Sequence, residues 1–455
     1  MSNYLEFLAS KKLAATLKAD VKIDASDVHH NLFDFQKDVV VKLVNMGGGA
    51  GFLDTGLGKT IIQCECARLI NRKTLFVAPL AVAHQTCREA KKLLDMDIVY
   101  SKDGTANSQF TITNYERLGH FDHSSFDVII LDESSILKGQ TSKTRAFLCE
   151  AFRNTPYKFA FTATPAPNDY MELGNHADFL GIMSQQEMLT RWFVHDSANT
   201  ADWRLKGHAV KPFWEWVASW AACLTKPSDI GYSDDGYDLP ALVTTTHMVN
   251  TDIVTNAEQG TLFDLSEVNA TSINRKMRET VHKRVEITAR MANTTDQPVI
   301  VWCESNEEST LLKSAIPDAV EVKGSDSPDS KEQKLMAFTD GTARVIVSKP
   351  SICGHGMNWQ HCRRQIFCST RYSYEYYYQA VRRSYRFGQT ESVEVDVLIP
   401  DNAIQAWRAI ERKANDHKGM KEHMRYASKG ISKKHEVKID YNPQMEGSLP
   451  SWLQQ

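Results

Sequence analysis

The 455-residue sequence has no apolar run that approaches the roughly 18 residues needed by a membrane-spanning helix. Its N-terminal stretch also lacks the continuous apolar core and the small-residue cleavage site of a secretory signal. The nine cysteines are scattered, and no two of them are spaced as CxxC. These absences argue against a membrane partner, an exported chain and a disulfide framework, so we expect a cytoplasmic protein with reduced thiols.

An excess of charge of one sign is missing too. The 53 Lys and Arg residues are balanced by 56 Asp and Glu residues, which leaves a formal net charge of −3. The field of the whole molecule therefore does not attract nucleic acid, and any nucleic-acid groove has to be a local basic strip. Composition alone does not distinguish a DNA motor from a metabolic enzyme.

Short apolar runs alternate with helical stretches along most of the chain. In the first half these runs lie at 50–54, 74–79, 110–115, 127–132 and 158–164. In the second half they lie at 298–303, 319–324, 343–348, 364–369 and 392–399. Nearly continuous apolar strands separated by helices are typical of parallel sheets buried on both faces. The two sets predict an α/β protein with two doubly wound lobes.

The same pattern predicts how the chain is divided. We expect an N-terminal arm, a first lobe, a second lobe with a leading linker helix and a polar tail, at 1–30, 31–250, 251–425 and 426–455. The strand-like run at 242–249 is expected to return to the first sheet. The basic stretch at 272–291 predicts a helix whose charges are solvated.

The first lobe contains a tryptophan-rich insertion at about 181–240. Five of the nine tryptophans lie here, at positions 192, 203, 214, 216 and 220. Helical spacing predicts one apolar stripe, formed by Phe213, Trp216, Val217, Trp220, Ala221 and Leu224. We interpret the stripe as a helix face packed on the first lobe. A second interpretation, base stacking on DNA, applies to the off-stripe Trp214.

The segment FLDTGLGKTIIQ (52–63) leads from a strand through a glycine turn into a helix that begins near Lys59. Glycines allow backbone N–H groups to point at phosphate oxygens, and the helix N-terminus adds positive potential. The strict pattern requires glycine at 53, where this chain has Leu53, so a chance glycine turn stays an alternative. As a phosphate loop, the segment supplies nucleotide-binding residues: Thr55, Gly56, Leu57, Gly58, Lys59 and Thr60. Lys59 is expected at the β- and γ-phosphates, and the Thr60 hydroxyl at Mg²⁺.

A second segment, DVIILDESS (127–135), ends a buried strand in two adjacent carboxylates. Strand ends of such a sheet open into the ligand crevice. Asp132 there can hold Mg²⁺ through water, and Glu133 can orient and deprotonate the attacking water. The alternative is a strand-end cap with a surface glutamate.

The third segment, QAVRRSYRFGQ (379–389), carries Arg383 and Arg386 one helical turn apart, so we expect them on one face. If the second lobe closes on the first, these side chains can stabilise charge on the γ-phosphate as arginine fingers. Paired arginines on an isolated helix are usually solvated, which is the alternative.

Together, and in this order, the segments resemble superfamily 2 helicase-like ATPases, in the Swi/Snf-type chromatin-remodeller branch of DNA translocases. The resemblance covers about residues 31–400. The sequence is most similar to the compact bacteriophage or bacterial members of this family. Further segments that carry the resemblance are LFDFQ (32–36), LFVAPLAVAHQ (75–85), ITNYERL (112–118), TATPAPN (162–168) and VSKPSICGHGMNWQ (347–360). The resemblance implies two RecA-like lobes with ATP and Mg²⁺ bound in the cleft between them. It also implies that Gln36 reads the adenine base, and that Thr162, Thr164 and the GHGMN loop couple the ATP and DNA sites.

The sequence departs from this family at two positions. Ser135 stands where the family has a histidine that links the hydrolytic carboxylates to the TATP segment, and Arg382 stands where an acidic residue is frequent. Duplex DNA is the partner that the resemblance favours, RNA stays open, and no protein partner is indicated. Two other functions stay open as well. One is a strand-separating helicase for DNA or RNA, and the other is a nucleic-acid-binding module in which ATP only sets the binding affinity.

Overall fold

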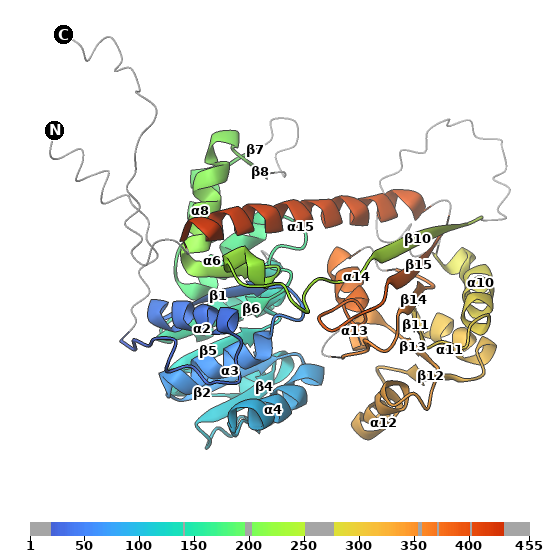
Figure 1. The fold of residues 1–455 in the computed structure, drawn as a ribbon, viewed down its shortest axis with the longest axis horizontal. Helices are drawn as coiled ribbons and strands as arrows, with labels where there is room; N and C mark the ends of the chain where they lie inside the picture. The colour runs from blue at the N-terminus through green and yellow to red at the C-terminus, as the bar shows by residue number, and fades with distance from the viewer. Residues whose placement is uncertain are drawn as a thin grey trace, which may run out of the picture.

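The computed structural model describes residues 20–139, 142–195, 203–250, 277–353, 357–370, 373–400 and 403–431. They form two α/β lobes that lie side by side, and the last helix, α15 (Ile404–Ile431), lies across both of them (Figure 1). Every strand pair within the two large sheets is parallel. The predicted fold class, two parallel-sheet α/β lobes with a tryptophan-rich insertion, is confirmed.

Lobe one is built on a seven-stranded sheet in the order β3-β4-β2-β5-β6-β1-β9. Its strands are β1 (Gly48–Leu53), β2 (Thr74–Ala78), β3 (Val99–Tyr100), β4 (Phe110–Asn114), β5 (Val128–Asp132), β6 (Tyr157–Thr162) and β9 (Ala221–Leu224). Its helices are α2 (Asp34–Met46), α3 (Lys59–Ile70), α4 (Leu80–Leu94), α5 (Lys143–Ala151), α6 (Leu173–Leu180), α7 (Gln185–Trp192) and α8 (Val210–Trp220). Alternate residues of β5 enter separate apolar clusters, with Ile129 in one and Ile130 in the other, so helices cover both faces of the sheet.

Lobe two is built on a six-stranded sheet in the order β10-β15-β14-β11-β13-β12. Its strands are β10 (Leu242–Val249), β11 (Val299–Trp302), β12 (Ala319–Val322), β13 (Val345–Ser348), β14 (Arg364–Phe367) and β15 (Val393–Pro400). The helices that precede α15 are α10 (Val281–Asn293), α11 (Asn306–Ala315), α12 (Pro328–Thr339), α13 (Pro350–Cys353) and α14 (Tyr374–Val381). All ten apolar runs expected as strands are strands, with ends within two residues of those predicted.

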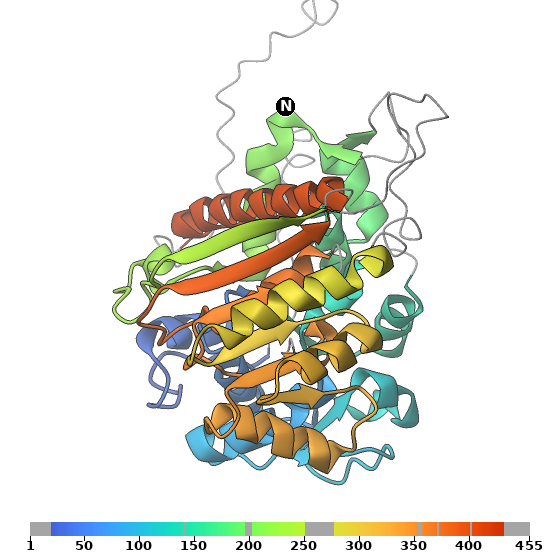
Figure 2. The same ribbon diagram turned by 90° about the vertical axis from the view of Figure 1, so that its right-hand side faces the viewer.

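The strand at 242–249 was assigned to the wrong sheet. β10 pairs along its whole length with β15, from Leu242 opposite Val393 to Val249 opposite Pro400. Figure 2 shows the two strands side by side at one edge of the lobe-two sheet. The corresponding edge of lobe one, next to β1, is occupied by β9. The sheet of lobe two therefore begins inside the span that the sequence assigned to lobe one.

The tryptophan-rich insertion consists of α7, a short hairpin of β7 (Phe193–His195) and β8 (Trp203–Leu205), and α8. Phe213, Trp216 and Trp220 are buried against lobe one, which confirms the packing interpretation. Ala221 and Leu224 were wrongly placed on the helical stripe, because α8 ends at Trp220 and β9 follows at once.

Trp214 is not available for base stacking. It is 3% exposed, meets Tyr170 edge to face at 5.3 Å and stacks on His423 of α15 at 5.7 Å. α15 extends to Ile431, beyond the point at which the sequence placed a polar tail. Among the described residues, no helix combines the length and apolarity required to cross a bilayer.

The basic stretch at 272–291 is only partly a solvated face. Residues 272–276 lie outside the described residues, and α10 begins at Val281. Arg284 is fully buried, where its Nη1 lies 2.6 Å from Glu308 Oε1 of α11 and donates to the carbonyl of Cys368 at 2.6 Å. The contacts of this buried arginine connect α10 to α11 and to the end of β14.

We expect Arg284→Ala to destabilise lobe two by about 3 kcal/mol, because it leaves the Glu308 carboxylate buried without its counter-charge. Denaturant unfolding followed by intrinsic fluorescence measures this loss. Arg290→Ala, at an exposed position of the same helix, is the matched control and should change stability by no more than about 0.5 kcal/mol. Equal effects of the two substitutions would contradict the role of the buried pair.

Candidate nucleotide site

The segment after β1 has the geometry of a phosphate loop. The backbone leaves the sheet at Asp54, whose N–H donates to the Leu224 carbonyl at 3.0 Å, and re-enters regular structure at Lys59, the first residue of α3. Gly56 and Gly58 have φ of +97° and +81°. A residue with a side chain would be strained in this backbone conformation. A Cβ on Gly56 would also lie 2.7 Å from Cβ of Phe387 in lobe two. Leu53 ends β1 with 1% exposure, so the loop forms without glycine there.

Lys59 points back over this loop. Its Nζ donates to the Leu53 carbonyl at 3.2 Å. Burial lowers the pKa of Lys59, while the nearby charges of Glu133, Asp132 and Asp54 oppose that shift. A cation held among carboxylates at the start of a helix is suited to bind the phosphates of a nucleotide. Thr60 follows in the first turn of α3.

The two carboxylates after β5 have different surroundings. Asp132 is 7% exposed and accepts a hydrogen bond from Gln63 Nε2 at 2.7 Å. Burial, and then the charge of Glu133, raise the pKa of Asp132 to about 6. Glu133 has φ of +51°, a conformation rare for a residue with a side chain and typical of functional sites. Burial raises its pKa too, against the opposing charges of Lys59 and Arg383.

Thr162 contacts Glu133 of this pair directly, and His176 contacts the neighbouring Ser134. Thr162 Oγ1 donates to Glu133 Oε2 at 3.4 Å and accepts from the backbone N–H of Thr164 at 3.1 Å. His176 of α6 is fully buried, with its Nε2 3.1 Å from Ser134 Oγ and its ring edge to face with Phe52. The TATP segment therefore reaches Glu133 directly through Thr162, although Ser135 replaces the histidine of the family pattern.

Lobe two faces these residues with α14 and the turns after it. α14 ends at Val381, so the prediction that Arg383 and Arg386 share one helix face is wrong. The chain continues in tighter turns, with Ser384 N–H bonded to the Val381 carbonyl at 3.3 Å. Both arginines nevertheless converge, because each donates to the Met357 carbonyl, Arg383 at 3.0 Å and Arg386 at 3.3 Å.

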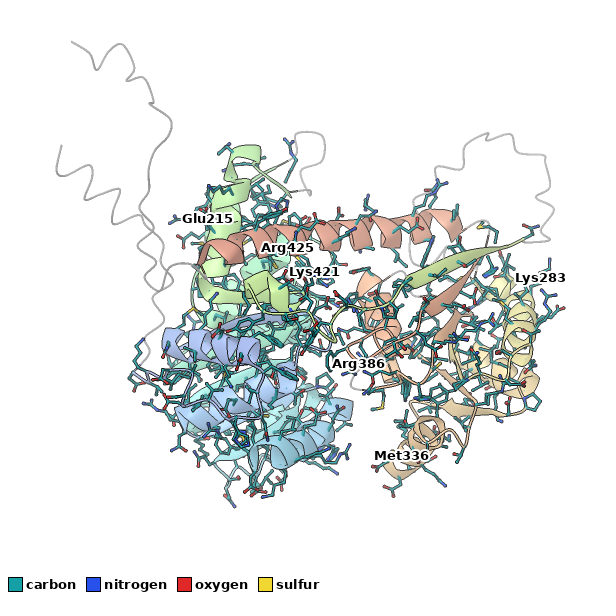
Figure 3. All side chains as sticks on the ribbon, viewed as in Figure 1. Glu215, Lys283, Met336, Arg386, Lys421 and Arg425 are labelled. Carbon is teal, nitrogen blue, oxygen red and sulfur yellow. The ribbon has the colours of Figure 1, made fainter. Side chains whose placement is uncertain are left out.

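Arg383 lies at the boundary between the lobes and is 4% exposed. Burial and then the charge of Arg386 lower the pKa of Arg383 to about 10, while the charge of Glu133 opposes the shift. Gln379 bridges the two, since its Nε2 donates to Glu133 Oε2 at 3.4 Å and its Oε1 accepts from Arg383 at 3.2 Å. Figure 3 shows Arg386 where lobe two faces lobe one.

Gln36 supports the phosphate loop from the other side. Its Oε1 accepts from the backbone N–H of Phe33 and its Nε2 donates to the Leu57 carbonyl, both at 3.0 Å. The side chain thus joins the start of α2 to the loop. Contact with an adenine base stays a prediction for this residue.

Two family models match the chain, and each falls on one lobe. Residues 30–167 match the model "Type III restriction enzyme, res subunit". This matched range contains the phosphate loop and the Asp132–Glu133 pair. Residues 279–388 match "Helicase conserved C-terminal domain", which contains Arg383 and Arg386. The chain is a superfamily 2 helicase-like ATPase. The paired domains make it an ATP hydrolase.

One solved structure supports the fold of this ATPase. The chain is similar to S. cerevisiae Dbp5 bound to RNA and ADP BeF3, with a TM-score of 0.55 and 11% identity over 87% of this chain and 94% of that one. It is also similar to the Sulfolobus solfataricus SWI2/SNF2 ATPase core in complex with dsDNA, with 16% identity over 90% of this chain and 96% of that one. The TM-score of 0.42 for the second is too low to assign the branch. No curated protein sequence matches the chain.

Several residues of the site were not predicted from the sequence. Lys138 of lobe one pairs with Glu375 of α14, and Asp54 pairs with Arg382. The only signal for this second pair was the unusual arginine at 382. His176 lies more than 40 residues from Ser134 along the chain, and no sequence pattern indicated that the two side chains are in contact.

The stability of the ATPase should depend on pH through His176. Burial lowers its pKa to about 4, so the unfolded chain binds this proton at higher pH than the folded chain. Stability therefore falls as the pH drops from about 6.5 towards about 4, by up to about 3 kcal/mol from this group.

Unfolding of wild-type and His176→Gln proteins at pH 7 and pH 5 measures this contribution. The variant should lose less stability than the wild type on acidification, whereas His208→Gln, at an exposed position, should behave as the wild type. Identical pH dependence in the wild type and His176→Gln would rule out the assignment.

Proposed function

We propose that this ATPase is a motor that uses ATP hydrolysis to translocate on DNA, with duplex DNA as its track, and so remodels or displaces bound complexes. The observation that supports it most is the meeting of both lobes at Glu133. Thr162 of lobe one and Gln379 of lobe two bond to the same carboxylate oxygen. A reaction at this carboxylate therefore changes the contact between the lobes, which is the requirement for converting hydrolysis into motion.

The residues fit Mg·ATP as substrate. The loop from Thr55 to Thr60 would hold the phosphates, with Lys59 at the β- and γ-phosphates. Mg²⁺ would be held by Thr60 and Asp132 and would neutralise charge on the phosphates. The donor set is consistent with this ion, because hydroxyl and carboxylate oxygens are its preferred ligands.

Glu133 is the proposed general base, and its raised pKa suits a group that takes a proton from water. Arg383 and Arg386 are the proposed arginine fingers that stabilise charge developing on the γ-phosphate. Both arginines donate to the carbonyl of Met357. A movement of the arginines at the γ-phosphate would therefore also move the segment that precedes Trp359. This is the proposed route to the nucleic acid. Gly354, His355 and Gly356 of the GHGMN loop lie outside the described residues.

The proposal of duplex DNA depends on the resemblance of the motifs to Swi/Snf-type translocases. Contacts to such a track would be mainly to phosphates, so binding should tolerate any sequence and weaken steeply with salt. A strand-separating helicase differs in its product, and a nucleotide-switched binding module differs in its turnover. A switch requires neither a base such as Glu133 nor arginines such as Arg383 beside it.

We expect Glu133→Gln to keep ATP binding and to lower turnover by at least about 100-fold, because the base is removed while the loop is intact. Lys59→Ala should instead weaken ATP binding. Calorimetric titration with Mg·ATP and a steady-state phosphate-release assay separate the two effects. Full ATPase activity of Glu133→Gln would remove the assigned base.

We expect duplex DNA to stimulate the ATPase more than single-stranded DNA or RNA, with a stimulation that declines as salt is raised. Phosphate release with each nucleic acid, and with none, measures this. Displacement of the third strand of a triplex without separation of the duplex would support translocation. Separation of the duplex would point to a helicase, and rates that no nucleic acid changes would contradict a motor.

A further inference from the structure

The helix α15 enters the hydrophobic cores of both lobes. Near its start, Trp407 and Ile410 belong to the lobe-two core, with Trp407 edge to face with Tyr377 at 5.4 Å. Near its end, Met420 and Met424 belong to the lobe-one core. Figure 1 shows this single helix lying across the top of both lobes. A helix anchored at both ends fixes how the lobes sit relative to each other.

One side chain of α15 reaches the phosphate loop. Lys421 Nζ lies 2.9 Å from Asp54 Oδ2, at the end of the helix that lies on lobe one (Figure 3). Arg382 Nη2 lies 3.0 Å from the same oxygen. The other oxygen accepts from the Tyr378 hydroxyl and, at 2.8 Å, from the backbone N–H of Thr55.

Asp54 therefore connects the end of α14 and the helix α15 to the first turn of the phosphate loop. Its carboxylate holds the Thr55 N–H, and its carbonyl accepts from Leu57 N–H at 3.3 Å. Because the side chain is only 9% exposed, solvent screens its charge weakly. Burial favours the neutral form, yet the charges of Arg382 and Lys421 outweigh it and hold the pKa of Asp54 well below its usual range.

The charge balance of this cluster bears on nucleotide binding. One carboxylate with two cations leaves a net charge of +1 beside a loop that has to bind polyanionic phosphates. Without Lys421 the cluster would be neutral, because Arg382 alone would balance the charge of Asp54. Loss of this positive charge disfavours a triphosphate at the loop.

We propose that Lys421 is a positioning residue for the nucleotide, which acts through Asp54 and makes triphosphate affinity depend on the docking of α15 against lobe one. The proposal rests on ATP binding at the phosphate loop as proposed above. Lys421 does not touch the nucleotide seat itself; it sets the charge and position of the carboxylate that organises the loop. A helix from the end of the described chain thereby controls a site formed near its beginning.

A purely structural role for Lys421, as one more contact of α15, makes a different prediction. Lys421→Met keeps an unbranched apolar side chain of similar length and removes the charge together with the hydrogen bonds to Asp54 and Tyr378. Asp54→Asn keeps an oxygen that accepts from Thr55 N–H and Tyr378, and also removes one charge. Combining the two returns the cluster to a net charge of +1, carried by Arg382. A charge mechanism predicts rescue by the second substitution, and a packing mechanism does not.

The test is the dissociation constant of Mg·ATP for the full chain, measured by titration calorimetry. Lys421→Met should raise it by roughly three- to tenfold. Lys421→Arg and the double variant Asp54→Asn/Lys421→Met should both be close to wild type. Lys418→Met, at an exposed position of the same helix, is the matched control and should leave it unchanged.

Three outcomes decide the matter. Weakened binding in Lys421→Met with recovery in the double variant supports the proposal. Unchanged binding in Lys421→Met, or a double variant as weak as the single one, overturns it while leaving the ATP site standing. A wild-type chain that binds no Mg·ATP would overturn both this proposal and the nucleotide site.

Discussion

The contact of Asp54 with Arg382 and Tyr378 determines where the two halves of this ATPase meet. All three side chains lie in a region from which most water is excluded, so leaving Asp54 or Arg382 without its counter-charge would be costly. The pairing places α14 against the phosphate loop, and with it Gln379 against Glu133. The sheets, the helices that cover them and the crossing helix α15 hold these contacts between the lobes in place.

The residues near Glu133 show how the ATPase accommodates an unusual motif. The family pattern has a histidine at the position of Ser135, whose hydroxyl here donates to the Glu133 carbonyl at 3.5 Å. Thr162 reaches the carboxylate directly, and a histidine from elsewhere, His176, fills the space behind Ser134. The connection from the Asp132–Glu133 pair to the TATP segment is thus present through Thr162.

Much of the fold could be predicted from the sequence, because buried parallel strands are apolar along their whole length and glycine marks the phosphate loop. The errors have physical causes. β9 was missed because AACL continues the apolar spacing of α8. β10 was misplaced because the eight residues of a strand do not indicate which sheet the strand joins. The turn at Arg382 gave no signal that α14 had ended. Pairings such as Asp54 with Lys421 bring together residues 367 apart and leave no local pattern.

The order of elements along the chain has a consequence for how the protein matures during synthesis. The last strand of the two sheets ends at Pro400 and α15 follows it, while the phosphate loop ends at Thr60. Domains fold largely as they leave the ribosome, the N-terminal one first. Lobe one can therefore acquire its sheet long before Lys421 emerges, and until then Asp54 lacks one of its two counter-charges. With the proposed role of Lys421, a nascent chain whose crossing helix has not yet been translated would bind ATP several-fold more weakly than the finished fold.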